Sequence, residues 1–136
     1  MHFKKKILSY IVLTILANMA HSNSFSKSVL GRWCWELDSA ISAFSLDITK
    51  SKKNSNLYIG SYYAVAYHGD KIDDNEKAFY FKNTTGNIIK AKIRTGISGA
   101  MGAIQLKFLD NKVEWLVTRF PDGEFYVPEK AIMKRC

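Results

Sequence analysis

Apolar and polar residues alternate along most of the chain beyond residue 30, with the spacing of a β-strand that buries one face. Between residues 43 and 50, for example, Phe44, Leu46 and Ile48 alternate with polar side chains. β-Branched and aromatic residues, which favour strands, are abundant in these segments. No segment beyond residue 30 keeps the period of a helix. The pattern therefore predicts an all-β fold.

Short polar or glycine-containing segments, typical of turns, separate these strands. Gly60 lies inside the longest apolar segment and indicates a bend or the close approach of another backbone. Residues 68–76 are predicted to form a polar loop, and residues 38–43 form either a connection or a single helical turn. The predicted strands span residues 30–37, 43–50, 57–67, 77–82, 88–95, 103–110 and 112–120, with a last short pairing over 124–136 that Pro128 interrupts.

About eight short strands joined mostly by tight turns can form a sandwich or a closed barrel. A meander whose first and last strands are tied together favours the barrel, because closure brings the two ends of the sheet side by side. Closure also removes exposed sheet edges. We therefore expect a small antiparallel meander β-barrel. The chain shows neither an internal repeat nor a linker, so residues 23–136 are expected to form one domain.

The first residues predict a secretory signal peptide over residues 1–22. A basic stretch at residues 4–6 precedes an apolar run over residues 7–17, and the small residues Ala20 and Ser22 follow at the positions that a signal peptidase recognises. A membrane anchor is the alternative, but a spanning helix needs about 20 apolar residues, and Asn18 and His21 interrupt the run earlier. We expect a periplasmic or secreted protein without a stable membrane span.

The chain contains two cysteines, Cys34 and Cys136, and both follow the signal peptide. An even pair in an exported protein predicts a disulfide. A bond between them would close a loop of about 100 residues and stabilise the fold by roughly 4–5 kcal/mol. Two cysteines and one histidine beyond the signal peptide are too few for a zinc site, and neither a metal nor a cofactor is expected.

Charge changes this picture little. The full chain has a formal net charge of +8, and removing the signal peptide with its three lysines leaves +5. Such a charge favours acidic partners or anionic surfaces. The lysines are spread over several segments, and their only dense group, at residues 50–53, lies in a predicted turn. Nucleic acid is therefore not expected as a partner.

Gly31, Arg32 and Trp33 form a G-x-W element at the start of the first predicted strand. This element resembles the one that opens lipocalins and lipocalin-like barrels. The resemblance implies that the glycine lets the chain turn and that Trp33 plugs the closed end of the barrel. It also implies that a basic residue packs on the indole, a role for Arg135 or Arg119. The chain is likewise similar to the short barrels of periplasmic proteins that inhibit lysozymes.

Residues that could carry catalysis are few. His68 is the one histidine beyond the signal peptide, and neither a nucleophile elbow nor a phosphate-binding glycine loop is present. The segment around Ser98 contains two glycines and is interpreted as a turn. An active site needs a convergent set of titratable groups, so we expect a protein that is not an enzyme.

Four carboxylates lie within the predicted polar loop, namely Asp70, Asp73, Asp74 and Glu76. Acidic loops can supply the six to eight oxygens that calcium requires. The spacing differs from that of an EF-hand, and a solvated loop is the preferred interpretation of the segment. Whether residues 70–76 bind calcium is left open at this stage.

Tyrosines are concentrated in the longest predicted strand. Tyr58 and Tyr62 lie on one face of this strand, and Tyr63 and Tyr67 lie on the other. The core takes one set and leaves the other exposed, where tyrosines favour interfaces. A second candidate surface is the corner at residues 97–102, whose small side chains suit insertion into a cleft. The candidate partner-binding residues are Tyr58, Tyr62, Tyr67, His68, Ser98 and Met101.

Export, small size and a stapled barrel favour a non-catalytic binding protein. The leading hypothesis is that it recognises a protein partner in the cell envelope, inhibiting or neutralising a cell-wall-active enzyme or a toxin. The alternative is a carrier or sensor of a small apolar ligand held inside the barrel.

Overall fold

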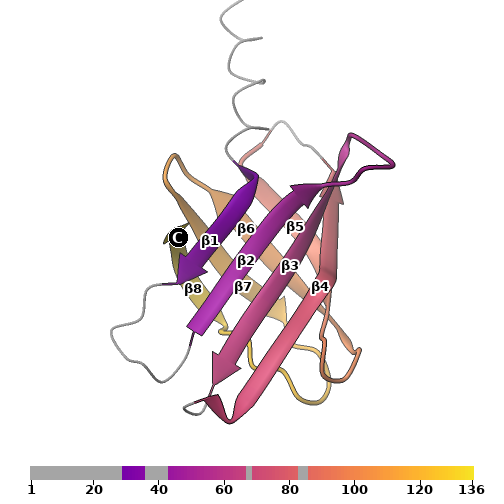
Figure 1. Cartoon of the computed structure of the whole chain (residues 1–136), viewed down its shortest axis with the longest axis vertical. Helices are drawn as coiled ribbons and strands as arrows, with labels where there is room; N and C mark the ends of the chain where they lie inside the picture. Colours follow the sequence, from indigo (N-terminus) through magenta and orange to yellow (C-terminus); the bar gives the residue numbers. More distant parts are fainter. Residues whose placement is uncertain (1–28, 36–42, 67–68, 83–85) are drawn as a thin grey trace, which may run out of the picture.

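A computed structural model describes residues 29–35, 43–66, 69–82 and 86–136. One antiparallel sheet of eight strands runs through these residues and curves into a nearly closed barrel (Figure 1). The strands are β1 (Gly31–Trp35), β2 (Ala43–Lys50), β3 (Leu57–Ala66), β4 (Lys71–Lys82), β5 (Ile88–Arg94), β6 (Met101–Phe108), β7 (Lys112–Arg119) and β8 (Lys130–Arg135). The expected all-β barrel is confirmed.

The first and last strands pair with each other, which turns the meander into a barrel. The strand order is β4-β3-β2-β1-β8-β7-β6-β5, so β1 lies between β2 and β8. In this register Trp33 pairs with Leu46 on one side and with Arg135 on the other. The barrel is interrupted only between β4 and β5, the two ends of the sheet order. We call this interruption the β4–β5 seam.

The predicted disulfide is present and lies beside the β1–β8 pairing. Cys34 bonds to Cys136, with 5.1 Å between the two Cα atoms. The contact that the lipocalin resemblance implied is also present: the Arg135 guanidinium lies 3.8 Å from the centroid of the Trp33 ring. Arg135 Nη1 donates a hydrogen bond to the carbonyl of Leu30. The chain segment before β1, the indole and β8 are therefore held together at this end.

Aromatic side chains from opposite halves of the barrel meet in its core. Phe44 of β2 contacts Trp115 of β7 edge to face, with 5.0 Å between the ring centroids. Trp33 of β1 contacts Phe108 of β6 at 6.4 Å. Pairs with this geometry stabilise a core beyond the area that they bury. The strands β1–β4 and β5–β8 thus face each other across one continuous core.

The structure corrects the prediction of a polar loop over residues 68–76. Strand β4 begins at Lys71, so most of the acidic segment lies in a strand. Asp73 points inward and is fully buried, whereas Asp74 and Glu76 are exposed. Carboxylates are uncommon inside a core unless they are hydrogen-bonded, which explains why the sequence resembles a loop here. Among the described residues, no cluster of three or more potential metal-binding side chains occurs.

A group does approach Gly60 closely, but it is an aromatic ring and not the backbone that the sequence predicted. Gly60 pairs with Phe79 of β4, and the register between β3 and β4 shifts between Gly60 and Tyr62. A Cβ atom on Gly60 would lie 2.1 Å from the Phe79 ring. The glycine therefore makes room for Phe79 in the core.

Two expectations concern residues outside the described ranges. The signal peptide is one of them, and the helical turn at residues 38–43 is the other, apart from Ala43, which begins β2. Within the part of the chain that the structure describes, no helix has the length and apolar character needed to span a membrane.

Candidate functional site

Two of the tyrosines that were predicted to bind a partner lie in the core, so their predicted exposure on the surface is wrong. Tyr58 and Tyr62 are buried, whereas Tyr63 on the opposite face of β3 is exposed. Alternation separated Tyr58 and Tyr62 from Tyr63, but which face is buried depends on how the sheet curves to enclose the core. Tyr67 and His68 lie outside the described residues.

Ser98 and Met101 lie at the predicted corner, between β5 and β6. Backbone hydrogen bonds between Thr95 and both Gly99 and Ala100 close this turn. The hydroxyls of Thr95 and Ser98 lie 2.7 Å apart, and Arg94 Nη1 donates to the carbonyl of Gly99 at 3.0 Å. Met101 follows with 39% of its surface exposed. The corner is thus a defined structure that presents Met101 to solvent.

A buried polar network ties this corner to the rest of the barrel. The Tyr62 hydroxyl donates to Asp73 Oδ1 at 2.7 Å and accepts the amide hydrogen of Gly96 at 3.1 Å. The amide of Tyr126 donates to the other oxygen of Asp73 at 3.3 Å. Burial, followed by the hydrogen bond to Asp73, raises the pKa of Tyr62. The network links β3, β4, the β5–β6 turn and the β7–β8 connection, and it has a structural role.

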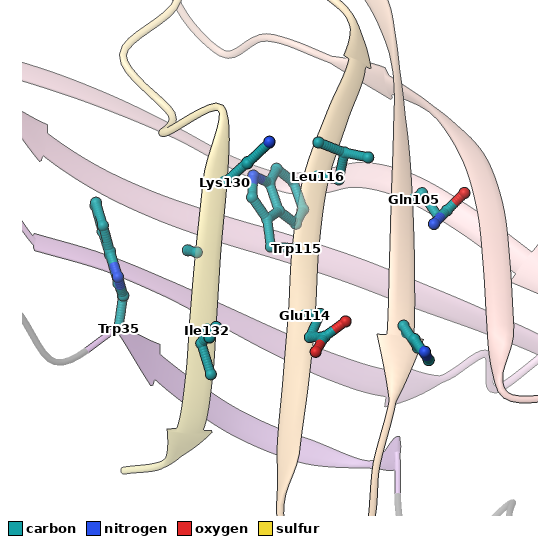
Figure 2. A pocket seen from close by; sticks show the side chains of 9 residues that line it. Trp35, Gln105, Glu114, Trp115, Leu116, Lys130 and Ile132 are labelled. Atoms are coloured by element: carbon teal, nitrogen blue, oxygen red, sulfur yellow. The ribbon is translucent and has the colours of Figure 1, made fainter.

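A hollow lies on the outside of the barrel, over β6, β7 and β8 beside the end of β1 (Figure 2). We call it the β7–β8 groove. Its volume is about 530 Å³. Trp35, Leu116 and Ile132 provide apolar side chains, and Gln105, Lys107, Glu114 and Lys130 provide polar ones. Trp115 and Ala131 complete the lining.

Strand alternation creates this groove. Leu116 lies between the buried residues Trp115 and Val117 and points outward, and Ile132 does the same between Ala131 and Met133. Ile132 is 56% exposed, the largest fraction among the exposed large hydrophobic residues. Apolar groups surrounded by hydrogen-bonding side chains are typical of a protein contact surface.

The sequence contained a signal for this groove that the prediction did not use. Alternation places Trp35 on the same face as Trp33, but β1 ends at Trp35, whose side chain lies beside β8 and stays partly exposed (Figure 2). Leu116 and Ile132 are apolar residues at polar positions of their strands. Apolar residues at positions where alternation predicts polar ones indicate an outward apolar surface. Leu116 and Ile132 become neighbours only because β7 pairs with β8.

Side chains occupy the inside of the barrel along the aromatic contacts. Besides the contacts of Trp33 and Phe44, the Phe79 ring lies 6.4 Å from Trp115 and the Phe81 ring lies 6.3 Å from Phe108. Tyr58 stacks on Phe81 at 5.1 Å. The Tyr58 hydroxyl is buried and has no hydrogen-bond partner among the described residues.

No family model, curated protein or solved structure matches this chain.

Proposed function

We propose that the chain is an exported, non-catalytic protein that binds another protein of the cell envelope and thereby inhibits or neutralises an enzyme or toxin. The observation that carries the proposal is the β7–β8 groove, an outward apolar surface on a barrel that is stapled by a disulfide. A preorganised surface binds tightly because little conformational entropy is lost on association. The exposed Ile132 and the neighbouring Trp35 are suited to act as anchors.

The test measures binding and inhibition against a panel of lysozymes and cell-wall amidases, together with capture from a periplasmic extract. Ile132→Asp places a charge in the groove and should weaken binding to the identified partner by about tenfold or more. Tyr63→Asp is the matched control, because Tyr63 is 45% exposed on β3, outside the groove and away from the β4–β5 seam. Absence of any bound protein, or equal losses in both variants, would contradict the proposal.

Carriage of a small apolar ligand remains the second candidate function. The buried Tyr58 hydroxyl favours it, because such a group is suited to bind the polar end of a ligand. The aromatic contacts across the core count against it. Native mass spectrometry of freshly purified protein decides between them, since a carrier should retain or take up a ligand and a filled barrel should show the mass of the polypeptide alone.

A further inference from the structure

Most of the basic residues that lie in strands belong to one half of the barrel. The strands β5–β8 contain nine lysines and arginines and a single carboxylate, Glu114. The strands β1–β4 contain five basic residues and four acidic ones. The β5–β8 strands therefore carry an excess of positive charge, which attracts acidic partners and accelerates their association. The connections between these strands contain four further carboxylates, namely Asp110, Asp122, Glu124 and Glu129.

The positive charge is most concentrated in a hollow along the β4–β5 seam. Its volume is about 400 Å³. Lys77 of β4 and Lys90, Lys92 and Arg94 of β5 line it, and no carboxylate does. The remaining lining consists of Ala78, Tyr80, Ala91 and Met101. Within the described ranges, none of the four cations forms an ion pair. The hollow thus combines uncompensated cations with apolar contact area.

At the seam, each of two strands has one edge without a ladder partner among the described residues. β4 and β5 are the two ends of the sheet order, so no ladder joins them. Asn75 Nδ2 of β4 donates to the carbonyl of Arg94 in β5 at 3.0 Å and bridges the seam at that point. Unpaired strand edges are sites where an extended segment of another chain adds main-chain hydrogen bonds.

We infer that the β4–β5 seam binds an extended acidic segment of the protein partner. Lys90, Lys92 and Arg94 are exposed at alternate positions of β5 and therefore share its outer face. Alternate residues of any extended chain are about 7 Å apart. A segment with carboxylates at alternate positions can consequently match these three cations in register. The inference rests on the proposed function, because it names the chemistry of the protein that the chain binds.

A short synthetic peptide of alternating glutamate and threonine, labelled with a fluorophore, tests the inference by fluorescence anisotropy. A peptide of the same composition with its glutamates in one block is the comparison. We expect the alternating peptide to bind more tightly, less so as the salt concentration rises. Lys90→Glu/Lys92→Glu should weaken its binding by about tenfold or more. The matched control, Lys52→Glu/Lys53→Glu, changes the net charge equally in the exposed β2–β3 turn and should bind as the wild type does.

The outcomes separate this inference from the proposed function. If both double variants lose peptide affinity equally, the effect depends on net charge alone, and the inference is overturned. Binding of polyphosphate or of anionic phospholipid vesicles through Lys90 and Lys92 without binding of the peptide would also overturn it. If a partner is captured and Lys90→Gln/Lys92→Gln still binds it normally, the proposed function holds but the seam has no part in it. Peptide binding without any envelope partner would support the seam and contradict the proposed function.

Discussion

At the scale of single residues, two buried tyrosines on the same strand face differ in one respect. The Tyr62 hydroxyl has two hydrogen-bond partners, Asp73 and the Gly96 amide, whereas the Tyr58 hydroxyl has none among the described residues. Removing a partner from a buried polar group costs about 1–3 kcal/mol, more when that group is charged. Removing a hydroxyl that has no partner does not incur this penalty.

We therefore predict that Tyr62→Phe lowers the free energy of unfolding by about 1–3 kcal/mol, because it leaves Asp73 and Gly96 without their shared partner. Tyr58→Phe should change it by less than about 0.5 kcal/mol or should stabilise the protein. Urea unfolding monitored by tryptophan fluorescence measures both. Equal losses in the two variants would show that the network of Tyr62 contributes nothing beyond packing.

The raised pKa of Tyr62 makes a second prediction, on the dependence of stability on pH. Its neutral phenol is favoured in the folded protein, whereas an unfolded tyrosine ionises near pH 10. The stability that this shift contributes is complete below about pH 10 and is lost as the pH rises from there toward the folded pKa. From about pH 9 to pH 11, the wild type should lose about 1.4 kcal/mol more than Tyr62→Phe. Parallel pH profiles from urea unfolding would contradict this.

At the scale of elements, the β3–β4 pair depends on the missing side chain at Gly60. Gly60→Ala puts a Cβ against the Phe79 ring and should destabilise the protein by about 1–3 kcal/mol. The double variant Gly60→Ala/Phe79→Leu should recover part of the lost stability, because leucine is smaller than phenylalanine and leaves room for the added Cβ atom. Gly86→Ala is the control, since no atom lies within 4 Å of a Cβ built there. Thermal unfolding followed by circular dichroism compares them, and a lack of recovery would show that the clash lies elsewhere.

The elements also show where prediction from sequence ends. Alternation located β2, β6 and β7 within one or two residues, because each buries one face and exposes the other. It failed at the start of β4, where the inward position is occupied by Asp73. The buried carboxylate of Asp73 accepts hydrogen bonds from Tyr62, 11 residues away, and from Tyr126, 53 residues away, and these bonds offset the cost of its burial. Local patterns contain no information about such distant partners.

The candidate site was harder to predict than the fold for the same reason. The tyrosines of β3 could be divided into two faces, but only the assembled sheet shows that Tyr58 and Tyr62 take the inner one. The groove residues Trp35, Leu116 and Ile132 come from three strands, so no window of sequence contains them together. The groove is defined by which residues of different strands lie side by side, and the composition of the chain does not reveal this.

At the scale of the whole molecule, the two junctions between the halves of the barrel are unlike. β1 and β8 join the halves through a hydrogen-bonded ladder, an indole–guanidinium contact and a disulfide. β4 and β5 leave the opposite junction without a ladder. The junction that closes the barrel is therefore the reinforced one, and the open one has the cationic hollow. The closed junction thus contains the contacts that hold the two halves together, and the proposed groove lies beside it, whereas the open junction contains the cations that form no ion pair among the described residues.

The last prediction concerns the disulfide at the β1–β8 junction. The Cys34–Cys136 bond spans 102 positions of the sequence, so it restricts the unfolded chain far more than the folded one. Cys34→Ser/Cys136→Ser should lower the free energy of unfolding by about 4–5 kcal/mol in the chain-entropy model. The barrel should persist under native conditions, because the β1–β8 ladder and the Trp33–Arg135 contact do not depend on the bond. Urea unfolding of the variant and of reduced wild type should agree. A loss below about 1 kcal/mol would mean that the unfolded chain already keeps its ends close together.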